Sequence, residues 1–176
     1  MALETKNDTV AQGLDDTNEE LPMLKLKSSD NEVFTLPTEY AKISNLVKTS
    51  LEQDEDADEV PIPGVKGASL KLVVNWMNHR KGVDMEPPEK PLRSKELKEI
   101  LKEDWLVTFW KFDDLQTLYD LILAANYMDI KALLHQGCAM VAAKIKGQPL
   151  EKIKDILDPK GTGQPAASTG DEKKDD

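Results

Sequence analysis

Apolar residues recur every three or four positions from Asp113 to Gly147, and this spacing is the strongest constraint that the sequence places on the fold. It predicts two consecutive amphipathic helices, because side chains three and four residues apart lie on the same side of a helix. Gly147 is typical of the residue that follows a helix C-terminus. The two apolar series are Leu115, Leu118, Leu121, Ile122, Ala125 and Met128, and then Ile130, Leu133, Leu134, Cys138, Val141 and Ile145.

Strand signals precede these helices. Apolar runs at 24–26 and 33–36 lie on either side of Ser28-Ser29-Asp30-Asn31, which predicts a hairpin closed by an Asx-type turn. We expect a helix that begins with Thr38 as its N-cap and runs to Leu51, followed by a solvated acidic loop. The segment Val60-Pro61-Ile62-Pro63 should form an extended sheet edge, because proline has no N–H to donate to a ladder.

Shorter helices are expected in the rest of the chain. The spacing from Leu70 to Met77 predicts a helix that is interrupted at Lys81-Gly82, and the proline-rich residues 84–93 are expected to form a flexible insertion. A short polar helix is expected over 95–102. A last short helix over 150–157 is expected to carry the apolar residues Leu150, Ile153, Ile156 and Leu157. Strands therefore come early and helices late, which is typical of an α+β domain.

Composition narrows the class of partner. A chain of 176 residues has room for one domain of ordinary size. Its formal net charge of -10 repels nucleic acid and anionic lipid, and no apolar run approaches the length of a membrane span. We therefore expect protein partners, no nucleic acid and no membrane, and a location in the cytoplasm and the nucleus.

No motif for catalysis or for a cofactor is found. The single Cys138 cannot form an internal disulfide, and His79 and His135 are too few to build a metal site. Cys138 and His135 lie three apart on a predicted helix, but we interpret them as a small buried thiol beside a surface imidazole rather than as a nucleophile and base. The aromatic residues between 105 and 112 are expected to be core rather than a ligand platform. The chain is therefore expected to be a non-enzyme.

The sequence closely resembles the Skp1 family at Leu121-Ile122-Leu123-Ala124-Ala125-Asn126-Tyr127-Met128-Asp129-Ile130-Lys131, extended by Ala132-Leu133-Leu134. The similarity continues in Leu26-Lys27-Ser28-Ser29-Asp30 with Val33-Phe34, in the acidic loop before residue 60, and in Cys138 with Val141-Ala142 and Ile145-Lys146-Gly147. It covers roughly residues 23–157 in consistent order. It implies a BTB/POZ fold, a small sheet flanked by helices, with a C-terminal helical extension.

The resemblance also implies a function and two binding sites. Skp1 family proteins are adaptors that bridge a cullin scaffold to F-box substrate receptors in SCF-type E3 ubiquitin ligases, for ubiquitin-dependent protein degradation. By motif match, Asn126 and Tyr127 face the cullin. The positions that match the F-box-facing residues are Leu118, Ile122, Leu134, Cys138, Val141 and Ile145.

Without the resemblance, the spacing of the residues allows two interpretations of each of these sites. Cys138, Val141 and Ile145 are spaced to form one stripe of a helix, which either docks a partner or packs on the rest of the domain. Tyr127 either contacts a partner or is a half-buried tyrosine whose hydroxyl is satisfied within the fold.

The expected organisation has four parts. These are a disordered acidic arm (1–22), a cullin-facing BTB/POZ-like domain (23–134), a shortened C-terminal helical region that binds the F-box (135–157) and a disordered tail (158–176). The Skp1 family continues into further helices that complete a clasp around the F-box, whereas this chain enters a polar tail. A second hypothesis therefore stays open, in which the chain is a POZ-type adaptor that has lost F-box recognition, either elongin C-like or a self-associating structural module. A homodimer of the free protein is a further open expectation.

Overall fold

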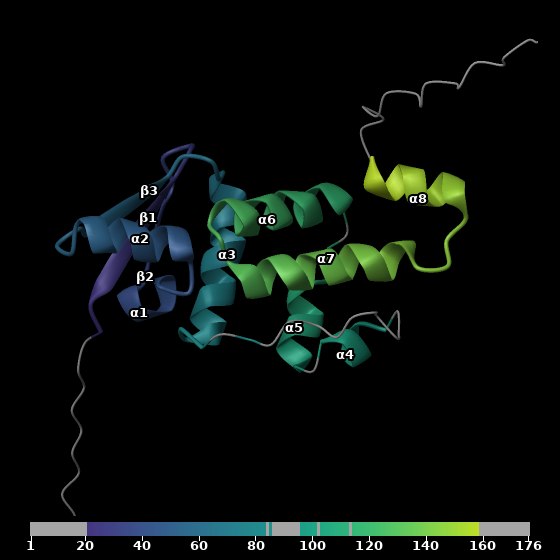
Figure 1. The fold of residues 1–176 in the computed structure, drawn as a ribbon, viewed down its shortest axis with the longest axis horizontal. Helices are drawn as coiled ribbons and strands as arrows, with labels where there is room; N and C mark the ends of the chain where they lie inside the picture. The colour runs from purple at the N-terminus through teal and green to yellow at the C-terminus, as the bar shows by residue number, and fades with distance from the viewer. Residues whose placement is uncertain (1–20, 84, 86–95, 102, 113, 159–176) are drawn as a thin grey trace, which may run out of the picture.

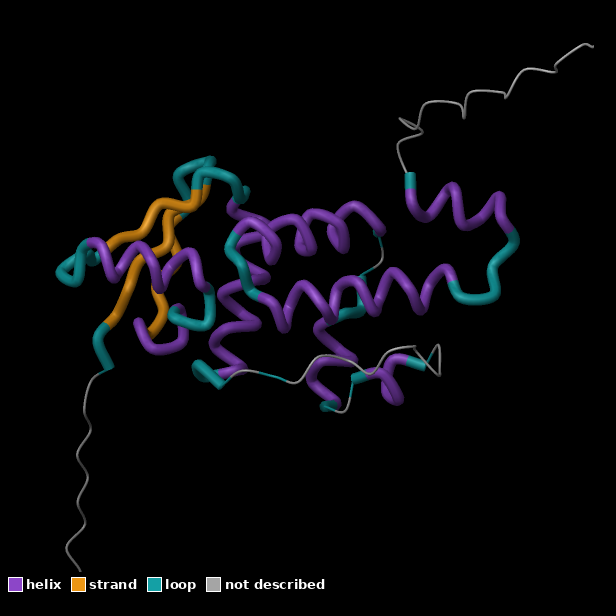
Figure 2. Tube along the Cα trace, in the orientation of Figure 1, coloured by secondary structure: helices purple, strands orange, loops and turns teal. Residues whose placement is uncertain are grey.

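A small sheet lies at one end of the molecule, helices make up the rest, and α8 (Leu150–Leu157) lies at the opposite end (Figures 1 and 2). The computed structural model describes residues 21–83, 85, 96–101, 103–112 and 114–158. The expected α+β architecture with a C-terminal helical extension is confirmed. The predicted tail after residue 158, the arm up to residue 20 and the insertion at 84–93, apart from Met85, lie outside the described residues.

The sheet joins β1 (Met23–Ser28), β2 (Val33–Pro37) and β3 (Glu59–Ile62) in the order β2-β1-β3. Strand β1 pairs antiparallel with β2 and parallel with β3, which confirms the hairpin and the extended edge segment. Successive side chains of a strand point to opposite faces, so alternate residues enter the core. The buried apolar members are Leu24, Leu26, Leu36, Val60 and Ile62.

The hairpin turn supplies the N-terminal cap of α3 (Gly67–Arg80). The Asp30 carboxylate accepts the backbone N–H of Gly67 at 2.8 Å and the hydroxyl of Ser28 at 2.5 Å. Asn31 adopts a left-handed φ of 63°, as an Asx-type turn permits. The Glu32 carboxylate lies close to Gly67, in the space that a Cβ at position 67 would take. The turn therefore fixes the sheet to α3.

Removal of the Asp30 carboxylate should reduce stability in a pH-dependent way. Hydrogen bonds from Ser28 and Gly67 hold the pKa of Asp30 below its ordinary value of 3.8. A carboxyl with a lowered folded pKa stabilises the protein above the unfolded pKa, and this stabilisation is lost as the pH falls through the folded pKa. We expect Asp30→Ala to lower the Tm at neutral pH, and the difference from wild type to shrink below about pH 4. Thermal unfolding followed by circular dichroism tests this, and a difference that is constant with pH would contradict it.

The single helix predicted from Thr38 to Leu51 is wrong, because the chain forms α1 (Thr38–Ala41) and α2 (Asn45–Gln53) instead. Ser44 separates them: its backbone is extended and its side chain accepts the N–H of Val47 at 3.3 Å. Its hydroxyl also donates to the carbonyl of Met128 at 2.5 Å. Thr38 is not the N-cap but the first helical residue.

The predicted helices around the core are confirmed. Helix α3 ends before Lys81 and Gly82, whose φ angles of 50° and 76° are left-handed. It packs against the sheet on one side and α6 (Leu115–Tyr127) on the other, and α7 (Lys131–Ile145) packs along α6 (Figure 1). Gly147, with a φ of 68°, follows the end of α7 as expected. The largest fully buried side chains on these helices include Trp76, Met77, Leu121 and Leu118.

Two short helices lie along the side of α7 away from α6 (Figure 1). They are α4 (Leu97–Ile100), shorter than the helix expected over 95–102, and α5 (Asp104–Phe109), which the apolar spacing did not predict. Helix α5 buries Leu106 and Val107 in the same core. The last expected helix is confirmed as α8.

Candidate functional site

One side of α7 carries apolar side chains that the rest of the fold covers only in part. We call Leu134, Cys138, Val141 and Ile145 the α7 stripe, since their spacing places them along one side of the helix. Cys138 is exposed, and the other three are half-buried. The residues that α7 buries occupy its remaining sides. Within the described part of the chain, the stripe is partly open to solvent.

Two expectations about the predicted F-box residues need correction. Cys138 is exposed, so the interpretation as a buried thiol is wrong; the thiol lies on the outer side of α7, while Gly137 and Met140 occupy the buried side. Leu118 is only 1% exposed and belongs to the core. Its side chain is therefore not part of the exposed surface.

Ile122 of α6 lies close to Gly137 of α7. A Cβ added at Gly137 would lie 2.5 Å from Cγ1 of Ile122 and 3.3 Å from Trp110, so glycine permits the close contact. Ile122 is half-buried and packs against the core. The buried part of Ile122 therefore packs α6 against α7, and its exposed part lies beside α7.

A second apolar area lies on α6. We call Leu123, Asn126 and Tyr127 the α6 patch; Leu123 is 64% exposed, Tyr127 is 41% exposed and Asn126 is exposed. The Tyr127 ring lies over Gly64, where an added Cβ would overlap it. Tyr127 is therefore packed on one face and open on the other. Leu123 was not predicted as a site residue. It could have been, because it lies outside the buried apolar series of α6 and four residues before Tyr127, on the same side of the helix.

Helix α2 holds the end of α6 in place. The side-chain amide of Asn45 donates to the Asp129 carboxylate at 2.8 Å, and the backbone N–H of Asn45 donates to the Asp129 carbonyl at 3.4 Å. The N–H of Leu46 donates to the carbonyl of Met128, also at 3.4 Å. Asp129 itself has a left-handed φ of 49°. These bonds fix the orientation of the α6 patch.

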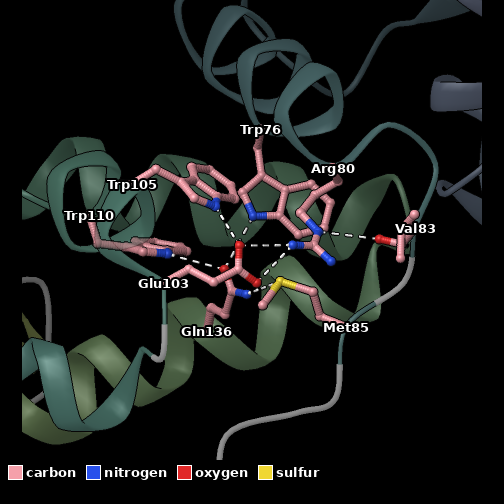
Figure 3. Close-up of polar contacts among 8 residues, drawn as sticks. All are labelled: Trp76, Arg80, Val83, Met85, Glu103, Trp105, Trp110 and Gln136. Atoms are coloured by element: carbon pink, nitrogen blue, oxygen red, sulfur yellow. Dashed lines mark hydrogen bonds and ion pairs between the residues drawn. The ribbon is translucent and has the colours of Figure 1, made fainter.

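Gln136 is a buried polar residue between the helices (Figure 3). Its side-chain carbonyl accepts the indole N–H groups of both Trp76 and Trp110, each at 3.2 Å. Its amide nitrogen donates to the sulfur of Met85 at 3.0 Å. The sequence-based predictions did not include this cluster of Gln136 and its partners. It could have been inferred from the presence of a glutamine at a position of α7 where the buried spacing favours an apolar residue. The cluster joins α3, α7 and the residue after α5.

A second set of polar contacts holds α5 against α3. Glu103 accepts two bonds from Arg80, at 3.0 and 3.1 Å, and one from the indole N–H of Trp105 at 2.5 Å (Figure 3). The ring of His79 stacks on Trp105, with centroids 4.7 Å apart. The aromatic residues of 105–112 pack against or within the core, which confirms their interpretation as core.

Several exposed side chains of the described residues are apolar and lie in groups. Besides the α7 stripe and the α6 patch, Leu150 and Leu157 of α8 are 65% and 55% exposed. Grouped apolar side chains of this kind are typical of protein–protein interfaces. Among the described residues, no group of three or more potential metal-ligating side chains occurs, and no described helix is long and apolar enough to span a membrane.

Comparison with known proteins identifies the family. A model of the Skp1 family tetramerisation domain matches residues 22–82, which contain the sheet and α1 to α3. A Skp1-related protein of Caenorhabditis elegans is 38% identical over 138 residues, covering 74% of this chain and 77% of the worm protein. The chain belongs to the Skp1 family. The resemblance inferred from the α6 motif is thereby confirmed, together with the POZ-like fold.

Two further Skp1 family relatives have similar coverage. An S-phase kinase-associated protein 1 homolog of Tetrahymena thermophila is 36% identical over 131 residues, covering 74% of this chain and 78% of the relative. An Arthroderma otae protein named E3 ubiquitin ligase complex SCF subunit sconC is 39% identical over 132 residues, covering 74% and 79%. The matched Skp1 domain ends before α6, so the α6 patch and the α7 stripe lie outside it.

Proposed function

We propose that this Skp1 family protein is the adaptor subunit of an SCF-type E3 ubiquitin ligase. It bridges a cullin to F-box substrate receptors for ubiquitin-dependent degradation, in the cytoplasm and the nucleus, and performs no chemistry itself. The name of the Arthroderma relative, an SCF subunit, supports this proposal. The observation that carries it is the presence of two apolar surfaces on adjacent helices, the exposed α6 patch and the partly open α7 stripe.

The α7 stripe is the proposed F-box site. Leu134, Val141 and Ile145 are half-buried, so each keeps apolar surface that an apolar partner helix would cover. Cys138 adds a small exposed side chain between them, and Ile122 borders the stripe from α6. Leu118 supports this region from the core. In this proposal, residues 135–157 form the F-box-binding region.

The α6 patch is the proposed cullin site, within a cullin-facing domain of residues 23–134. Tyr127 and Leu123 offer apolar area, and Asn126 offers an exposed amide for hydrogen bonds. Gly64 supports the ring of Tyr127 from below, so the ring is already placed before a partner binds. An adaptor that binds both partners at once holds the substrate and the ubiquitin-charged enzyme at high effective concentration.

Replacement of Tyr127 tests this assignment. Wild-type protein, a cullin N-terminal domain and an F-box protein should form one ternary complex in size-exclusion chromatography. We expect Tyr127→Ala to weaken cullin binding by about 30-fold, the effect of losing a central aromatic side chain, and to leave F-box binding unchanged. Biolayer interferometry measures both affinities. Val33→Ala, which truncates another exposed apolar side chain on β2, is the matched control and should change neither. A wild-type chain that captures neither partner would end the proposed function.

A further inference from the structure

Helix α8 cannot hold its position by burial. It has eight residues, and in this fully described helix none is buried. Isolated helices shorter than about 12–15 residues are marginal in water, so α8 depends on contacts with the rest of the protein. Ile153 and Ile156 are half-buried, whereas Leu150 and Leu157 project apolar surface into solvent.

The chain reverses direction between α7 and α8. After Ile145 the loop turns through Gly147, where the N–H of Gln148 donates to the carbonyl of Ile145 at 3.0 Å. Helix α8 then runs back toward the N-terminal end of α6 (Figure 1). Its first residue is therefore tethered to α7 by a short loop, while its last turn needs a separate anchor.

Tyr119 of α6 provides that anchor. Its hydroxyl donates to the backbone carbonyl of Ile156, in the last turn of α8. The last four carbonyls of a helix have no partner within the helix, so this hydroxyl satisfies a group that would otherwise depend on water. Tyr119 is half-buried, and burial raises the pKa of its hydroxyl above 10.0, so the group remains a donor at neutral pH.

We propose that Tyr119 is a positioning residue that locks α8 against α6, so that Leu150 and Leu157 extend the α7 stripe as a further wall of the F-box site. This inference rests on the proposed function. Helix α8 contacts α7, so the two exposed leucines of α8 would continue the surface that Val141 and Ile145 begin. The Tyr119 hydroxyl thereby fixes the positions of the two exposed leucines before a partner binds.

Tyr119→Phe tests the lock, because it removes the hydroxyl and keeps the ring. We expect amide hydrogen exchange in residues 148–158 to become about 3–10-fold faster in the free protein, and the affinity for a purified F-box domain to fall about 3–10-fold. Exchange is measured by mass spectrometry on that peptide. Cullin binding and the Tm should remain within error of wild type. Tyr40→Phe, which removes a phenol hydroxyl from α1 at the sheet end of the molecule, is the matched control.

The outcomes separate this inference from the proposed function. If wild type binds the F-box domain and Tyr119→Phe shows unchanged exchange or unchanged affinity, the inference is overturned and the proposed function stands. If wild type binds no F-box domain, the proposed function fails and α8 loses its docking role. Faster exchange together with weaker F-box binding, both absent in Tyr40→Phe, supports the inference.

Discussion

Replacement of Gln136 by leucine should destabilise the protein by about 2–6 kcal/mol. The side-chain carbonyl of Gln136 is the acceptor for two buried indole N–H groups, those of Trp76 and Trp110, each at 3.2 Å. Leucine has a similar size but no acceptor, so both N–H groups would remain buried without a partner, and each such group costs about 1–3 kcal/mol. Urea unfolding followed by tryptophan fluorescence measures the loss directly.

Three further variants make the Gln136 experiment specific. Gln53→Leu, an exposed glutamine at the end of α2, is the matched control and should change stability by less than about 0.5 kcal/mol. Gln136→Glu keeps an oxygen that accepts both indole N–H groups. It should be less destabilised than Gln136→Leu if these two hydrogen bonds stabilise the fold by more than the burial of a carboxylate costs. Adding Trp110→Phe to Gln136→Leu should cost less than the sum of the single changes, because one stranded N–H is removed with it. A loss below about 1 kcal/mol for Gln136→Leu would show that the indoles have another partner.

The helices that could be predicted are those whose contacts repeat along the sequence. The apolar series of α6 and α7 indicated that both helices exist. Of the α7 series, however, only Ile130 and Leu133 are buried, so the series did not give the orientation of α7. The break between α1 and α2 could not be predicted in this way, because the Ser44 hydroxyl donates to a carbonyl 84 residues away. Similarly, the cap of α3 comes from Asp30 in the hairpin and not from the residues beside Gly67. Local spacing carries no information about such tertiary bonds.

The spacing of the site residues along the helices could be predicted from the sequence, but the burial of their side chains could not. The spacing of Cys138, Val141 and Ile145 correctly indicated one stripe, but the general tendency of cysteine to be buried gave the wrong burial for Cys138. Leu118 and Leu123 show the same difficulty on α6: the first is in the core and the second is mostly exposed. Which apolar side of a helix a neighbour covers depends on the packing of α3, α6 and α7, and only the structure gives this.

A glutamate at the centre of the α7 stripe should have the largest effect on binding. Val141 is half-buried between Cys138 and Ile145, so a partner that covers the stripe would bury the new carboxylate against apolar side chains. The desolvation of an unpaired charge costs several kcal/mol. We therefore expect Val141→Glu to weaken F-box binding by at least about 100-fold and to leave cullin binding unchanged, since Tyr127 lies on the neighbouring helix. Isothermal titration calorimetry with each partner measures the two affinities.

Because Val141 also packs against the core, the charge must be separated from damage to the fold. Cys138→Glu introduces the same charge at an exposed position of the same stripe, where the free protein keeps it hydrated, and it should weaken F-box binding without lowering the Tm. Thr108→Glu, at an exposed position of α5, adds an equal charge on a different helix and should change neither affinity. If Cys138→Glu and Val141→Glu both bind the F-box protein like wild type, the stripe is not the docking surface, and a POZ-type adaptor that lacks F-box recognition becomes the better description.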